Sequence, residues 1–272
     1  QLLCFGLALW NGRDPILKER IYGLTPHEGN HGEDPKDYYY YLDSTPTHSY
    51  MRYLYKYPQA EFPYQQLIDE NRARGGRGAE FELLDSGVFH EDRYFDVFME
   101  YAKAGPDDIC IRITVHNRGP EDAPLHIIPN LWFRNIWSWG ETPEVAPSIA
   151  SQPGNANAVC LLADDTHATG LSNLPFKYTL GPRRLYGERD GALLFTDNET
   201  NRARLYGAEA GGGQHYAKDA FHRHIIHGED CVNPAQRGTK ACLHYQRTVP
   251  AGGHISIRLR MTKDTLDDPL AE

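Results

Sequence analysis

Several features that mark common protein classes are missing from this chain of 272 residues. No stretch approaches the ~20 apolar residues of a membrane helix, and no charged start is followed by an apolar run and a cleavage site. The chain has 28 lysines and arginines against 37 aspartates and glutamates, and no basic run could hold a phosphate backbone. We therefore expect no nucleic acid and no membrane among its partners.

The signature loops of several enzyme classes are also absent. The sequence contains no G-x-S-x-G, no G-x-G-x-x-G and no phosphate-binding loop. It therefore gives no support to a serine hydrolase, a dinucleotide-binding protein or a nucleotide hydrolase. Carboxylate pairs are frequent, but spacing along a chain cannot place two of them across a glycosidic bond. We predict no cofactor.

Cysteine is scarce, and its spacing fits neither a disulfide framework nor a metal site. The five cysteines are odd in number, and no two of them form C-x-x-C. Cys4, Cys110, Cys160 and Cys242 stand among apolar residues, where a reduced cysteine behaves as a small buried hydrophobic residue; the fifth is Cys231. Free thiols in a reducing compartment, the cytoplasm, are the simpler interpretation.

Strand patterning dominates what the sequence does contain. Only 3 methionines but 17 tyrosines favour strands over helical bundles. Apolar and polar residues alternate in 109–115 and 254–261, which gives each strand one buried and one solvated face. Strands are predicted at 2–10, 81–89, 94–102, 109–117, 125–133, 159–163, 203–206, 240–249 and 254–261. Short helices are predicted only at 63–72 and 218–225. The fold class is therefore all-β, a large antiparallel β-sandwich with long loops and one or two short helices.

Three of the four tryptophans fall within eight residues, at Trp132, Trp137 and Trp139. Indole rings stack well on sugar rings, and Arg134 and Asn135 add planar donors that could fix hydroxyl groups. The alternative is a strand whose inward aromatic side chains fill a core. Both interpretations stay open for each tryptophan, and a role at a site or a domain interface is favoured for the stretch as a whole.

A polar segment rich in glycine and histidine occupies residues 25–34. Its letters include H-E-x-x-H, but that zinc motif requires a helix, and the proline, glycines and asparagine in and around it disfavour one. We expect no metal there. The segment is either an internally hydrogen-bonded surface loop or a loop that lines a pocket or docks another domain. Its candidate residues are His27, Glu28, Asn30, His31, Glu33 and Asp34.

A second histidine cluster has the pattern H-x-H-x-x-H at His222, His224 and His227. No cysteine stands within the pattern and no carboxylate has a clear ligand spacing, so a loop with hydrogen-bonded histidines is favoured over a metal site. Phe221 and His222 are candidates for contact with a substrate or with another domain.

Several of these blocks together resemble a known family. Residues 10–15, 18–25, 27–34 and 39–50, with the tryptophan run 131–140 and residues 218–222, are similar to bacterial proteins related to glycoside hydrolase family 63, which includes mannosyl-oligosaccharide glucosidase. The resemblance implies an N-terminal β-sandwich, a linker and an (α/α)6 barrel that carries both catalytic carboxylates and hydrolyses with inversion. It places 1–262 in the sandwich, without its first strands, and 263–272 at the start of a linker to the absent barrel.

The resemblance therefore implies a non-catalytic role for this chain, because none of its residues matches the family's catalytic acid or base. It would dock its own C-terminal (α/α)6 domain and shape the rim of a site for oligosaccharides. Two alternatives remain open. One is a mutarotase-like sugar epimerase, which needs a histidine acid and a carboxylate base facing each other. The other is a carbohydrate-binding module with the tryptophan run as its platform.

Overall fold

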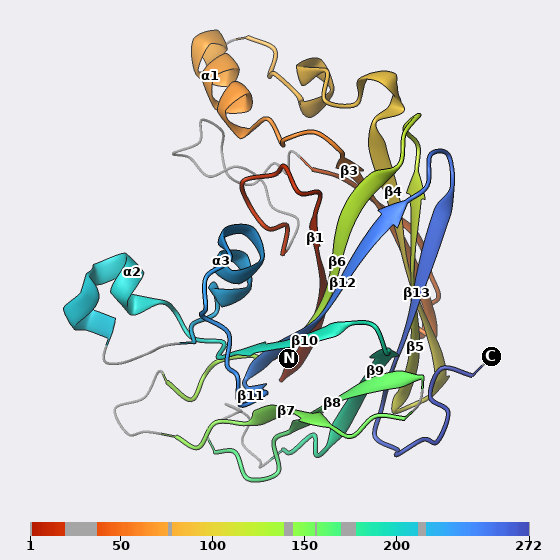
Figure 1. Cartoon of the computed structure of the whole chain (residues 1–272), viewed down its shortest axis with the longest axis vertical. Coiled ribbons are helices and arrows are strands. Elements are labelled where there is room, and N and C mark those ends of the chain that lie inside the picture. Colours follow the sequence, from red (N-terminus) through yellow and green to blue (C-terminus); the bar gives the residue numbers. More distant parts are fainter. Residues whose placement is uncertain are drawn as a thin grey trace.

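Two antiparallel β-sheets packed face to face form the body of the protein (Figure 1). The computed structural model describes residues 2–19, 37–75, 78–138, 144–155, 157–169, 178–211 and 216–271. The predicted all-β sandwich is confirmed. No helix in the described part of the chain is both long and apolar enough to cross a membrane.

The smaller sheet has four strands. Its order is β1 (Leu3–Trp10), β6 (Ala123–Phe133), β12 (Lys240–Val249) and β10 (Ala192–Thr196). Because side chains alternate along a strand, Leu9 and its register partner Ile127 face the larger sheet, whereas Ala8 and its partner Ile128 face outward.

The larger sheet has nine strands. In order across the sheet they are β11 (Arg237–Gly238), β7 (Ser148–Gln152), β8 (Ala158–Asp164), β9 (Arg183–Glu188), β13 (His254–Thr262), β5 (Asp108–Asn117), β4 (Tyr94–Gly105), β3 (Tyr50–Pro58) and β2 (Tyr38–Ser44). The alternation predicted for β5 and β13 holds: Ile113 pairs with Ile257 on the inner face. These inner residues and those of the smaller sheet form the main core.

The two sheets are joined at one end by a very short crossing. β11 belongs to the larger sheet and β12 to the smaller one, and only Thr239 lies between them. The Thr239 amide donates to the carbonyl of Thr196 at 3.1 Å, and its carbonyl accepts from the Phe133 amide at 3.0 Å. Gly238 is required there, because a Cβ at that position would overlap the Thr196 carbonyl.

Three α-helices are described, α1 (Tyr64–Arg74), α2 (Arg202–Tyr206) and α3 (Ala220–His227). The first and third confirm the predicted helices. The strand predicted at 203–206 is wrong, because the Asn201 side chain accepts from the Arg204 amide at 3.0 Å and caps a helix instead. Gly207, with a positive φ of 93°, ends that helix.

The strand predicted at 81–89 is also wrong. Residues Leu83–Ser86 form a 3-10 turn that begins with reciprocal side-chain capping: the Asp85 carboxylate accepts from the Glu82 amide at 2.9 Å. Gly87, with φ of 74°, ends the turn. Nearby polar side chains provide hydrogen bonds to the backbone of this turn, so the apolar pattern does not lead to a strand.

The cysteines are all free, but their predicted burial holds only in part. Cys160 and Cys242 are buried, whereas Cys4 is half-buried and Cys110 is exposed on the outer face of the larger sheet. The burial predicted for Cys110 is therefore wrong.

The C-terminal segment 263–271 returns along the outer face of the larger sheet. Leu270 packs against Ala158, Cys160 and Tyr186, and the Asn155 amide donates to the Asp267 carbonyl. That this segment starts a linker to a further domain stays a prediction.

Candidate functional site on the outer face of the smaller sheet

The outer face of the smaller sheet carries a group of buried and half-buried polar and aromatic side chains. We call it the α3 face, because α3 packs on it through Phe221, Ile225 and Ile226 (Figure 1). Its sheet residues are Ala8, Trp10, His126, Ile128, Asn130, Trp132, Lys240, Cys242, His244 and Leu194.

Two histidines meet at the centre of the α3 face. His126 Nδ1 lies 2.8 Å from His244 Nε2, and the Trp10 ring meets the His126 ring edge-on with centroids 4.8 Å apart. Burial lowers the pKa of His126 and lowers the pKa of His244 to about 4, with the nearby His126 and His224 charges adding to the effect. Both rings are therefore neutral near pH 7, so one imidazole N–H donates to the other ring nitrogen.

Ion pairs with buried lysines lie along the margin of this face. Lys240 Nζ lies 2.5 Å from Glu19 Oε1, donates to the Lys218 carbonyl at 3.0 Å and stands over the Phe221 ring. Glu19 comes from the segment after β1, 221 residues away in the chain. Because a buried charge without its partner is unfavourable by several kcal/mol, about 3–5 in measured cases, this pair fixes the 17–19 segment on the sheet.

A second lysine also pairs with a carboxylate and lies over a phenylalanine ring. Lys18 Nζ lies 3.2 Å from Asp37 and 3.6 Å from the centroid of the Phe62 ring. Asp37 also accepts from the Tyr55 hydroxyl at 2.6 Å. The lysine and the carboxylate are thus both held in place, at the two ends of the stretch 20–36 that the structure does not describe.

The residues of the tryptophan run differ in how far they are buried. Trp137 is 5% exposed, belongs to the main core and donates its indole N–H to Glu199 at 3.1 Å. Trp132 is half-buried and lies over Gly6, where a Cβ would approach its ring to 3.1 Å. Asn135 builds a turn by accepting from Ser138, and Arg134 is exposed. Within this run, Arg134, Trp132 and Asn135 are the described candidates that keep exposed surface.

The two candidates on α3, Phe221 and His222, hold the helix against the rest of the protein. Phe221 is fully buried between α3 and the sheet. His222 Nδ1 accepts from the Leu17 amide at 3.3 Å, and burial lowers its pKa. The pattern of His222, His224 and His227 lies on a helix and not in the predicted loop. No metal-binding group of three ligands occurs among the described residues.

The remaining candidates lie outside the described residues: His27, Glu28, Asn30, His31, Glu33, Asp34 and Trp139. Sequence reasoning missed Trp10, His126 and His244. No short motif in the sequence links these three residues. The register of β1, β6 and β12 is what brings them together.

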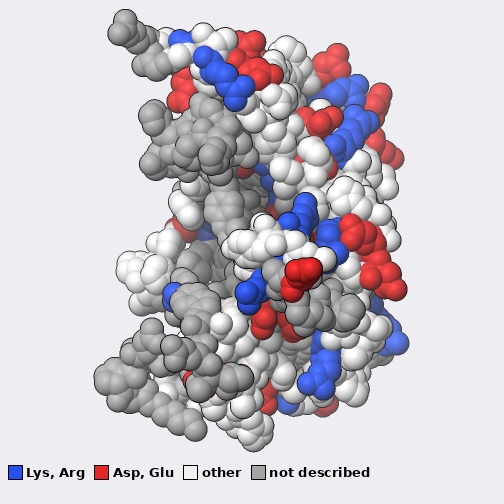
Figure 2. All heavy atoms as spheres, turned by 90° about the vertical axis from the view of Figure 1, so that its left-hand side faces the viewer, with Lys and Arg blue, Asp and Glu red and all other residues white. Residues whose placement is uncertain are grey.

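Several further carboxylates on this side are paired with arginines. Besides the two lysine pairs, Asp219 binds Arg204 and Arg223 at 3.1 and 3.4 Å, and Glu229 binds Arg223 at 2.9 Å. Figure 2 shows this side of the molecule, where charges of both signs are interspersed on the described surface. The arrangement is suited to holding a surface in shape, because its acids and bases are committed to one another.

Comparison with known proteins supplies one long match. No family model matches the chain. It is similar to the uncharacterized protein YMR196W of Saccharomyces cerevisiae, with 40% identity over 288 residues. The alignment covers 97% of this chain and 26% of the yeast protein. The chain thus spans about a quarter of the length of this curated relative. A bacterial source and the resemblance to glycoside hydrolase family 63 stay predictions.

Proposed function

We propose that this β-sandwich is a non-catalytic domain of a larger glycoside hydrolase, an inverting α-glycosidase similar to family 63. It docks the catalytic (α/α)6 barrel on the side of the α3 face and shapes the rim of the oligosaccharide site. The observation that carries the proposal is the pairing of Glu19 and Asp37 with buried lysines. Both carboxylates are already engaged by a lysine, and Asp37 also by the Tyr55 hydroxyl, so they are poorly placed to exchange protons with a substrate.

Exposed apolar groups on the same side support a docking role. α2 lies beside α3 (Figure 1), and its Leu205 and Tyr206 are 61% and 71% exposed. Ile16, which precedes the buried Leu17, is 44% exposed. Clustered apolar exposure marks interaction surfaces more often than isolated residues do. The length of the yeast relative also fits a domain that works within a larger protein.

The two alternatives have less support from the described contacts. A mutarotase-like epimerase needs a histidine that faces a carboxylate, whereas His126 and His244 face each other. A binding module would present its tryptophans, whereas Trp137 is buried in the core. The free cysteines fit the cytoplasmic location that we include in the proposal.

The test uses the full-length yeast relative and its segment that aligns with this chain. Both are assayed for sugar release from α-linked gluco- and manno-oligosaccharides. We expect release by the full-length protein and none by the segment or by this chain. Activity of the isolated segment would place the chemistry in the sandwich, and inactivity of the full-length protein on every such substrate would contradict the glycosidase assignment.

A further inference from the structure

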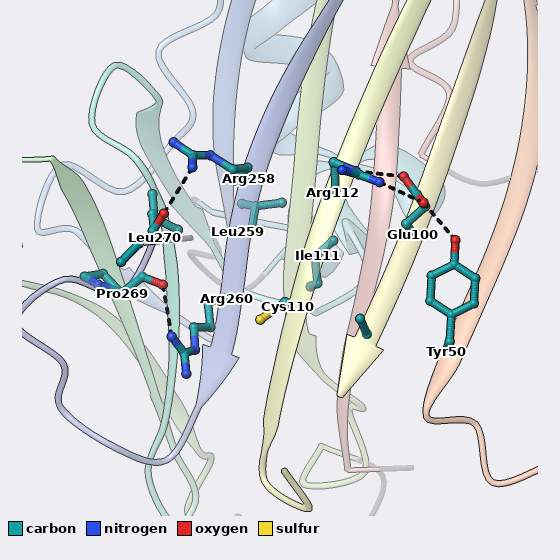
Figure 3. Close-up of a pocket in the computed structure, with 12 residues that line it drawn as sticks. Tyr50, Glu100, Cys110, Ile111, Arg112, Arg258, Leu259, Arg260, Pro269 and Leu270 are labelled. Carbon is teal, nitrogen blue, oxygen red and sulfur yellow. Dashed lines mark hydrogen bonds and ion pairs between the residues drawn. The ribbon is translucent and has the colours of Figure 1, made fainter. Parts of the chain in front are cut away.

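The outer face of the larger sheet carries a second feature, remote from α3. A pocket of about 310 Å³ lies across β13, β5, β4 and β3, with the end of the C-terminal segment as one wall (Figure 3). Its size is at the lower end of small-molecule sites in proteins.

Register explains why the sheet is hollow at this place. One cross-strand row runs Arg260, Cys110, Ala102, Tyr50, so two small side chains stand between two long ones. Side chains in such a row lie on one face of the sheet, and the small ones form a trough. Pro269 and Leu270 close its β13 end, and the trough floor is apolar.

The neighbouring row supplies charge. It runs Arg258, Arg112, Glu100, so that two arginines are direct register partners, an arrangement that is unfavourable without an anion nearby. Figure 3 shows how the row resolves this: Arg112 turns to Glu100, with hydrogen bonds of 2.8 and 3.0 Å, and Arg258 turns to the Leu270 carbonyl at 3.2 Å.

The three arginines that line the pocket are unequally neutralised. Arg112 is paired with Glu100, which also accepts from the Tyr50 hydroxyl at 2.8 Å, and Arg260 is paired with Asp108 through both carboxylate oxygens. Arg258 has a longer ion pair: its Nε lies 3.7 Å from Glu188 Oε1, an oxygen that also accepts from the Arg258 backbone N–H at 3.1 Å. The charge of Arg258 is therefore only partly neutralised, and its guanidinium keeps N–H donors for a ligand beyond the one given to Leu270.

We propose that this pocket binds a small organic carboxylate. The carboxylate accepts from the guanidinium of Arg258, with Arg112 adding to the positive potential, and a compact apolar body lies over Cys110 and Ala102. A planar guanidinium group suits a carboxylate because two of its parallel N–H donors match the two carboxylate oxygens. This site is independent of the glycosidase proposal, since it lies on the opposite sheet.

The test is a fluorine NMR titration of the whole chain with para-fluorobenzoate. We expect saturable binding with a dissociation constant on the order of 1 mM. Arg258→Gln, which keeps a donor for the Leu270 carbonyl, should weaken binding roughly tenfold, as the loss of a charge-assisted hydrogen bond does. Ala102→Phe, which fills the trough without changing charge, should abolish it. The matched control is Arg247→Gln, at an arginine near the end of β12 in the smaller sheet that is paired with Asp190, and it should bind like the parent.

A second readout does not depend on the variants. Cys110 is the exposed cysteine, so it should be the first to react with iodoacetamide, and bound para-fluorobenzoate should slow that reaction. Neutral para-fluorobenzyl alcohol should give no protection. Equal binding of acid and alcohol, equal affinity in Arg258→Gln, or no saturable binding would each overturn the proposal.

Discussion

Acidification should destabilise this protein through His244. The ring is 8% exposed, and its pKa in the folded state is about 4 against 6.5 for a free imidazole. The folded protein binds this proton only at lower pH than the unfolded chain does, so stability is complete above the unfolded pKa and is lost as pH falls toward the folded one. This lowering of the His244 pKa from 6.5 to about 4 corresponds to about 3 kcal/mol of stability.

The neighbouring ring acts in the same direction. Burial also lowers the pKa of His126, whose Nδ1 lies 2.8 Å from His244, and two positive rings at that distance would repel each other. Loss of stability should therefore be steep once the pair begins to take up protons. The structural result would be loosening of α3 from the sheet, because His224 of that helix lies close enough to His244 to lower its pKa.

Urea unfolding measured between about pH 7.5 and about pH 4.5 checks this. His244→Gln keeps hydrogen-bonding capacity and removes the titration, so its free energy of unfolding should fall less steeply with pH, by nearly one proton. His167→Gln, at an exposed histidine, is the control and should leave the slope unchanged. A His244→Gln slope equal to that of the parent protein would refute the assignment.

Three further changes test the packing. Trp137→Ala should lower the free energy of unfolding by about 3–5 kcal/mol, as expected for a core aromatic; a loss below 1 kcal/mol in urea unfolding, roughly that of a surface site, would mean that the ring is not part of the core. Lys240→Met should cost about 1–3 kcal/mol, because the half-buried Glu19 carboxylate loses its charge-assisted hydrogen bond, and a thermal scan should find that adding Glu19→Gln restores part of the loss. Gly6→Ala should destabilise by about 1–3 kcal/mol through contact with the Trp132 ring, with a change in tryptophan fluorescence; unchanged stability and fluorescence would argue against the stacked geometry.

The fold class could be predicted because strand period is a local property. Alternation in β5 and β13 was visible along the sequence, and the register confirms it. The same period explains the error at Cys110: its neighbours Ile109 and Ile111 are apolar, but in a strand they point to the opposite face. Apolar neighbours along a strand therefore say little about burial of the residue between them.

The centre of the α3 face could not be predicted, because it depends on pairing between distant strands. His126 and His244 are 118 residues apart and meet only through the register of β6 with β12. For the tryptophan run, the sequence left the role of each indole ring open. Composition marked it correctly as unusual, but the division between buried Trp137 and half-buried Trp132 follows from where β6 ends, which propensity does not determine.

The single-residue crossing at Thr239 has a consequence for how the molecule opens. The chain leaves one sheet at Gly238 and enters the other at Lys240, so the connection is too short to extend. The two sheets therefore cannot separate at this end without breaking hydrogen bonds in both. The amides of β10, β11 and β12 should then exchange with solvent as one cooperative unit, at the free energy of global unfolding. Strain applied to the exterior of either sheet would pass through this point to the other.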